Sequence, residues 1–98
     1  METFNQLIQS DTPVLVDFYA DWCGPCKAMA PVIQEVATAV KGKARVVKIN
    51  IDKNAATPTQ YQVQAVPTFI LFKNGQVLWR HPGMIDKTSL ISVIEQHT

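Results

Sequence analysis

The sequence has little of several features that would assign it to other classes of protein. Its 98 residues include only two cysteines and two histidines, and the net charge is +1. A charge so small argues against a surface whose main role is to bind nucleic acid or an anionic membrane. No apolar run approaches the roughly 20 residues of a bilayer-spanning helix. No glycine-rich phosphate loop is present either, so we expect no flavin, nucleotide or other cofactor.

What is present fits one globular domain. Hydrophobic residues make up 47% of the chain and charged residues 17%, which is a composition typical of a folded protein with a core. We therefore expect one domain spanning residues 1–98. The first residues lack a basic region followed by an apolar stretch, so we expect no signal peptide and a cytoplasmic location.

The hydrophobic pattern predicts an α/β fold, with helices on both faces of a mixed sheet. The run at residues 14–19 is apolar almost throughout, as in a central strand covered on both faces. Further strands are expected at residues 46–51, 68–73 and 76–80, the last two joined by the hairpin dipeptide Asn74-Gly75. A long helix between the first two strands implies a parallel crossover.

Capping signals predict where the helices begin. Thr3 with Gln6 forms a capping-box pattern ahead of a first helix, and Asp86 is placed to cap the last one. Thr57 is predicted to cap a short helix, with Pro58 in its first turn and Gln60 completing the box. The long helix is expected to run from the cysteines to about residue 40.

Two charged residues interrupt apolar strands. Asp17 either ends its strand early and is solvated, or is a buried acid behind the cysteines. Lys48, in the second strand, could simply extend its ammonium group to the surface.

The two cysteines, Cys23 and Cys26, stand three apart where a strand leads into a helix. The positive end of a helix dipole stabilises a thiolate, which is the species that attacks disulfides. A Cys-x-x-Cys pair in this context is typical of a redox motif. The alternative is a metal site, but zinc needs four ligands, and the remaining soft donors, His81 and His97, are distant in sequence.

The motif Trp-Cys-Gly-Pro-Cys-Lys at residues 22–27 resembles the active-site signature of the thioredoxin family. Further matches follow in the same order along most of the chain, at residues 16–20, 48–52, 66–68, 72–75 and at Gly83. The resemblance implies a thioredoxin-like fold. Members usually carry one more strand before the first helix, and this chain starts too late to hold it. We therefore expect about four strands, with residues 44–51 as an uncovered edge.

The resemblance implies a protein-disulfide reductase, a dithiol electron carrier that serves cell redox homeostasis. We expect Cys23, first in the motif and beside an exposed tryptophan, to attack the target disulfide, and the deeper Cys26 to resolve the mixed disulfide. Asp17 is the candidate proton acceptor for Cys26. By resemblance, Lys48 is its partner and Pro67 is cis and faces the cysteines. The expected partners are oxidised target proteins and a separate thioredoxin reductase-type donor.

Two further groups of residues follow from the same resemblance. Gly24 and Pro25, with no histidine between the cysteines, are typical of reducing members, whereas an oxidase or isomerase of the same fold is the alternative. A scaffold without catalysis also stays open. A flat docking surface is expected, made of Trp22, Gly24, Pro25, Val66, Pro67, Thr68, Gly83 and Met84. We expect a monomer, with a weak dimer through the free edge strand as a hypothesis.

The chain departs from the family pattern at two places. Tyr19 stands where many members carry tryptophan, which we expect to change the packing slightly. Trp79 and His81 precede Gly83 in an unfamiliar segment, and His81 is expected at the surface, where it could alter the pH dependence of the site.

Overall fold

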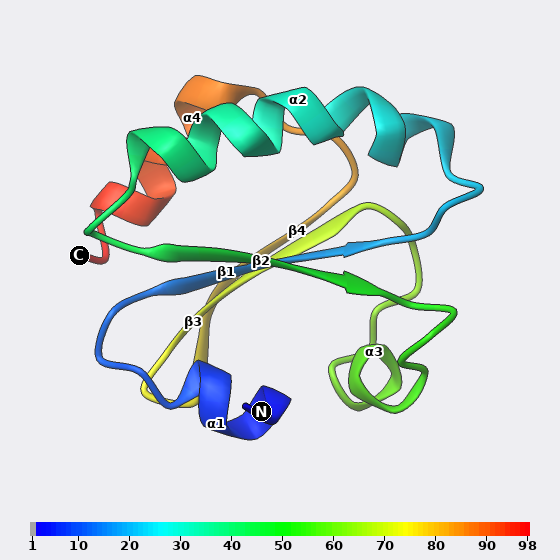
Figure 1. The fold of residues 1–98 in the computed structure, drawn as a ribbon, viewed down its shortest axis with the longest axis horizontal. Helices are drawn as coiled ribbons and strands as arrows, with labels where there is room; N and C mark the ends of the chain where they lie inside the picture. The colour runs from blue at the N-terminus through cyan, green and yellow to red at the C-terminus, as the bar shows by residue number, and fades with distance from the viewer. Residues whose placement is uncertain (1) are drawn as a thin grey trace.

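The computed structural model describes residues 2–98; Met1 lies outside the described part. Within it, four strands form one mixed sheet in the order β2-β1-β3-β4 (Figure 1). β1 runs parallel to β2 and antiparallel to β3, and β3 is antiparallel to β4. The strands are β1 (Val14–Tyr19), β2 (Arg45–Asn50), β3 (Thr68–Lys73) and β4 (Gln76–Pro82). The predicted α/β class and the parallel crossover are confirmed.

Helices cover both faces of this sheet. They are α1 (Phe4–Ile8), α2 (Gly24–Ala39), α3 (Ala56–Gln60) and α4 (Lys87–Glu95). Figure 1 shows α2 and α4 on one face and α1 and α3 on the other. Alternate residues of β1 enter the two cores: Leu15 packs with α2 and α4, whereas Val16 and Phe18 pack on the opposite side. This alternation places Asp17 on the face beneath α2.

Most of the predicted helix ends are confirmed. The Thr3 hydroxyl accepts the N–H of Gln6, and the Gln6 side chain accepts the N–H of Thr3, which completes the capping box. Asp86 caps α4, and hydrogen bonds from the Ser89 hydroxyl and N–H lower the pKa of its carboxyl group.

In the hairpin, Asn74 and Gly75 both have positive φ, as a type I′ turn requires.

The short third helix is present, but its predicted N-cap is wrong. Ala55 is the N-cap, and Thr57 lies inside the first turn with no capping role. Pro58 still falls within the first turn, where its missing N–H breaks no helical hydrogen bond. The proline is therefore compatible with both starting points and could not distinguish them. Strand bounds also differ slightly, because β2 begins at Arg45 and β4 continues through Pro82.

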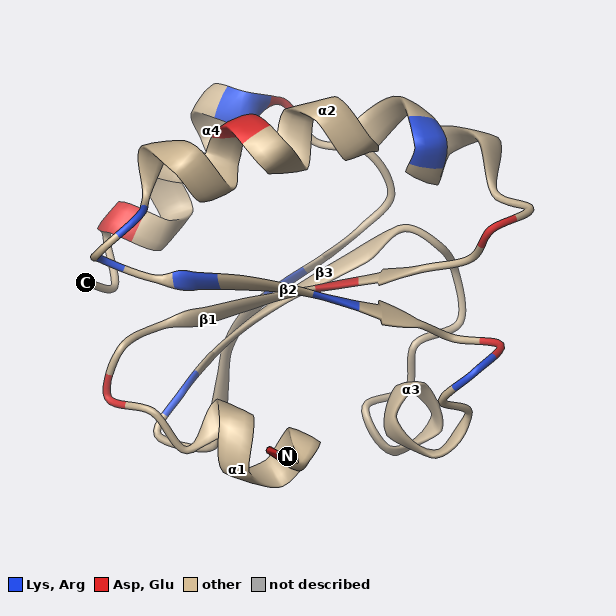
Figure 2. Cartoon of the chain, in the orientation of Figure 1, with Lys and Arg blue, Asp and Glu red and all other residues tan. Residues whose placement is uncertain are grey.

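β2 is an edge strand, since nothing in residues 2–98 pairs with its outer side. Charges at this edge are partly paired: Arg45 contacts Glu2 at 3.3 Å, and Lys43, just before the strand, contacts Glu95 at 3.3 Å. Figure 2 shows charged segments of both signs scattered over the ribbon rather than one sign gathered on a face. Among the described residues, no helix combines the length and apolar composition needed to cross a membrane.

Candidate active site

The two cysteines lie at the start of α2. Cys23 is the N-cap residue in an extended conformation, and its Sγ atom accepts the backbone N–H of Cys26 at 3.1 Å. Gly24 and Pro25 fill the first two helical positions, where a proline lacks only a hydrogen bond that no residue makes there. Cys23 and Cys26 are joined as a disulfide, with their Cα atoms 5.2 Å apart. The N-terminus of a helix favours negative charge on a group at the cap position.

The expectation that Cys26 lies deeper than Cys23 is wrong for this disulfide state. Cys23 is 3% exposed and Cys26 is 7% exposed. Cys23 is covered because its Sγ atom lies 3.6 Å from the carbonyl oxygen of Val66, on a segment far along the chain. Position at the helix N-terminus, rather than exposure, therefore distinguishes the two thiols.

The segment opposite Cys23 has the conformation that the resemblance implied. The Val66-Pro67 peptide bond is cis, and Pro67 is buried. The Thr68 hydroxyl, also buried, donates to the carbonyl oxygen of Ala65 at 2.6 Å. The Gly83 N–H donates to the Pro67 carbonyl at 2.7 Å, with Gly83 at φ +90°, a conformation that favours glycine. The loop after β4 is thus bonded to the proline segment.

Two apolar side chains of the predicted docking surface are exposed: Trp22 at 67% and Met84 at 54%. The Trp22 indole Nε1–H donates to the Asp52 carboxylate at 2.9 Å, which fixes the ring beside the disulfide. Asp52 is held in turn by a hydrogen bond from its own N–H to the Asn50 side chain at 2.9 Å. Sequence reasoning gave Asp52 no role, although it belongs to a stretch that matches the family.

The alternative in which Asp17 is solvated is wrong. Asp17 is 4% exposed, and its Oδ1 atom has no hydrogen-bond partner in the structure. Burial raises the pKa of this carboxyl from 3.8 to about 6, and the positive charge of Lys48 acts in the opposite direction. Asp17 can therefore gain or lose a proton near neutral pH, which an ordinary surface aspartate cannot do.

Lys48 is Asp17's neighbour in the parallel register of β1 and β2. Its side chain is exposed, and no ion pair within 4.0 Å joins it to Asp17 in the described structure. Its ammonium nitrogen instead lies 4.5 Å from the centre of the Tyr19 ring. Lys48 thus acts on Asp17 through its field rather than through a direct contact.

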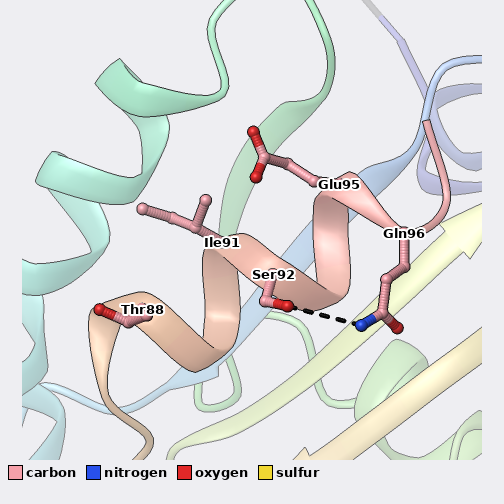
Figure 3. Close-up of a pocket in the computed structure, with 5 residues that line it drawn as sticks. All are labelled: Thr88, Ile91, Ser92, Glu95 and Gln96. Atoms are coloured by element: carbon pink, nitrogen blue, oxygen red, sulfur yellow. Dashed lines mark hydrogen bonds between the residues drawn. The ribbon is translucent and has the colours of Figure 1, made fainter.

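A cavity of about 180 Å³ adjoins Cys26. Its lining comes from the end of β1, the start of α2 and β2: Tyr19, Ala20, Asp21, Cys26, Lys27, Ala30 and Lys48. A larger hollow of about 420 Å³ lies on the outer side of α4, lined by Thr88, Ile91, Ser92, Glu95 and Gln96 (Figure 3). None of the predicted site residues lines that hollow, whereas Cys26 and Lys48 both line the smaller cavity.

The two histidines that the metal-site alternative would need, His81 and His97, make separate contacts. In residues 2–98 no group of three or more His, Cys, Asp or Glu side chains is placed to hold a metal ion. His81 is half-buried, stacks on Trp79 with ring centres 5.9 Å apart, and has its Nε2 atom 3.1 Å from the Met84 carbonyl oxygen. The Nδ1 atom of His97 lies 2.8 Å from the Val93 carbonyl oxygen, near the C-terminus.

Comparison with known proteins agrees with this geometry. A family model described as Thioredoxin matches residues 1–96. The chain belongs to the thioredoxin family. It is 50% identical to a thioredoxin of Haemophilus influenzae over 93% of this chain and 85% of that protein. It is 46% identical to thioredoxin 1 of a Nostoc species, over 97% of this chain and 90% of that protein.

A plant relative is similar over part of its length. The chain is 47% identical to the chloroplastic thioredoxin Y of rice, over 95% of this chain and 56% of that protein. Thioredoxins are disulfide oxidoreductases, and the Cys23–Cys26 pair has the spacing of their active site. The protein is therefore a dithiol protein-disulfide reductase.

Proposed function

We propose that Cys23 is the attacking thiolate and Cys26 the resolving thiol of a cytoplasmic reductant. The observation that carries this assignment is the position of Cys23 as the N-cap of α2, with its Sγ atom accepting the N–H of Cys26 at 3.1 Å. That hydrogen bond and the helix dipole favour negative charge on the Cys23 sulfur. Cys26 lies one turn inside the helix and has no such cap position.

The reaction proceeds in two exchange steps. The Cys23 thiolate attacks one sulfur of the target disulfide, so a Cys23–target bond forms and the other target sulfur leaves as a thiolate. Cys26 then loses its proton and attacks the Cys23 sulfur, which releases the second target thiolate. The target gains two electrons, and the protein is left with the Cys23–Cys26 disulfide of this structure. Because both thiols belong to one chain, the second step is effectively unimolecular.

Asp17 is the proposed proton acceptor for Cys26. Its pKa of about 6 lies close enough to neutrality for proton exchange in the cell. A cavity of about 180 Å³ adjoins Cys26, and its lining includes Lys48, the register neighbour of Asp17. Lys48 favours the ionised form of Asp17, which is the form that can accept the proton.

The target is proposed to dock as an extended strand. Val66 lies half-buried beside Cys23, and its carbonyl oxygen is 3.6 Å from the attacking sulfur. A target backbone paired with Val66 would bring its disulfide to Cys23, as in other cases of strand addition. The exposed Trp22 and Met84 side chains provide apolar contacts at the rim. Gly24 and Pro25 are exposed and Gly83 is half-buried, so they can contribute to this surface, whereas Pro67 and Thr68 are buried.

We propose that a separate thioredoxin reductase-type enzyme returns the electrons and that the protein works as a monomer. The edge strand β2 carries Arg45 and Lys48, and lysine and arginine side chains discourage edge-to-edge pairing. Sedimentation at high concentration should give a single species of 10.9 kDa. A dimer would point to pairing through β2.

The reduction potential of the Cys23–Cys26 pair separates a reductant from an oxidase or isomerase. We expect a value of about −270 mV, a measured property of thioredoxins rather than a quantity read from this structure. The pair would be equilibrated with glutathione or dithiothreitol buffers, and the fraction oxidised measured by thiol alkylation. A value above roughly −200 mV would indicate an oxidase or isomerase instead. Failure to form the disulfide would leave the scaffold alternative.

A further inference from the structure

The contact between Lys48 and Tyr19 has no role in the steps above. Tyr19 is the last residue of β1, and its register partner on β2 is Asn50, two residues beyond Lys48. The Lys48 side chain therefore leans along the strands toward the end of the sheet where α2 begins. There its ammonium nitrogen lies 4.5 Å from the centre of the Tyr19 ring, within the range of a cation–π interaction.

The position of this contact matters because both side chains line the cavity beside Cys26. Tyr19 is half-buried, whereas Lys48 is exposed at the edge of the sheet. An ammonium group on four flexible carbons is strongly hydrated. With no ring to hold it, the group would extend from the edge strand into water and away from the buried carboxyl group.

The cavity beside Cys26 is lined by few titratable groups. From α2 come Cys26, which does not titrate as a disulfide, and the exposed Lys27. From the loop after β1 comes the exposed Asp21. From β2 comes Lys48, the only charge with a marked effect on the Asp17 carboxyl. The location of the Lys48 ammonium group therefore controls the field at that carboxyl.

We propose that Tyr19 is a positioning residue whose ring holds the Lys48 ammonium group at the cavity beside Cys26 and so keeps its charge near Asp17. The proposal rests on the proton-acceptor role of Asp17 given above. It assigns a task to the position at which this chain has tyrosine and many family members have tryptophan. The faces of tyrosine and tryptophan rings both attract a cation, so either residue could hold the lysine ammonium group.

A double-mutant cycle tests the proposal. The pKa of the Asp17 carboxyl would be measured by NMR titration of the oxidised protein, in which neither cysteine titrates. Lys48→Gln should raise this pKa by about one unit, because it removes an opposite charge. Tyr19→Leu should raise it in the same direction, and Tyr19→Phe, which keeps the ring, should leave it at the wild-type value. In the Lys48→Gln background, Tyr19→Leu should have no further effect.

Three results would overturn the proposal. They are an unchanged Asp17 pKa in Tyr19→Leu, a lowered one, or an equal effect of Tyr19→Leu with and without Lys48. The last would mean that the ring acts through burial of Asp17 and not through the lysine. If Tyr19→Leu fails to fold, the contact can be tested in the wild-type protein by NMR. The ring current of Tyr19 should shift the resonances of the Lys48 ε-methylene protons upfield. Unshifted resonances would contradict the contact.

This cycle is independent of catalysis. It is carried out without a target protein, so its outcome does not depend on whether Asp17 accepts the Cys26 proton. Failure of the proton-acceptor role would appear only in the rate of mixed-disulfide resolution. The two proposals therefore fail in different measurements.

Discussion

Asp17→Asn should slow the resolution of the mixed disulfide by about 100-fold while leaving the first attack by Cys23 nearly unchanged. The reason is that the amide cannot take the proton that Cys26 must lose, whereas the hydrogen bond to the Cys23 sulfur and the helix dipole remain. A general base typically contributes two to four powers of ten to a proton-transfer step. The loss should therefore be confined to the second step.

Single-turnover kinetics with the reduced protein and excess target disulfide separates the two steps. The first is followed by the appearance of the mixed disulfide and the second by its disappearance. Asp21→Asn is a matched control, because it removes the same charge from an exposed residue that lines the cavity beside Cys26. Equal resolution rates in Asp17→Asn and wild type would remove Asp17 from the mechanism.

The same substitution should make the folded protein more stable at pH 7, by about 3 kcal/mol. Asp17 has a pKa of about 6 in the folded state and 3.8 ordinarily, so folding binds its proton more tightly. Below pH 3.8 both states are protonated and no stability is lost. As pH rises from 3.8 to 6, stability falls by about 1.36 kcal/mol per pH unit, and above pH 6 the full loss remains. Asparagine avoids this loss.

Urea unfolding of the oxidised proteins at pH 7 and pH 3.5 measures the effect. The gain from Asp17→Asn should be present at pH 7 and absent at pH 3.5, which ties it to ionisation and not to packing. Asp21→Asn should leave the free energy of unfolding within about 0.5 kcal/mol at both pH values. An equal gain at both pH values would show that ionisation of the buried Asp17 carboxyl does not lower the free energy of unfolding.

Much of the fold could be predicted because local signals agreed with the packing. The apolar run of β1 indicated a strand covered on both faces, and Asp17 inside it was correctly singled out as a possible buried acid. The capping box at Thr3 and the cap at Asp86 were correct because both satisfy helix N–H groups within three residues. At Thr57 the same pattern misled, since Pro58 fits either helix start.

What the sequence could not provide comes from contacts between distant segments. The burial of Cys23 depends on Val66, 43 positions away, and the orientation of Trp22 depends on Asp52. The Lys48–Tyr19 contact follows from the register of two parallel strands and the direction in which a long side chain leans. Local periodicity carries no information about such pairings.

Trapping of the mixed disulfide tests most directly the claim that Cys23 attacks and Cys26 resolves. Reduced Cys26→Ser protein mixed with insulin, a disulfide-linked protein, should accumulate a covalent adduct that dithiothreitol cleaves. Cys23→Ser protein should form no such adduct and should lose its reductase activity. An adduct that forms with Cys23→Ser and fails to form with Cys26→Ser would reverse the assignment and contradict the mechanism.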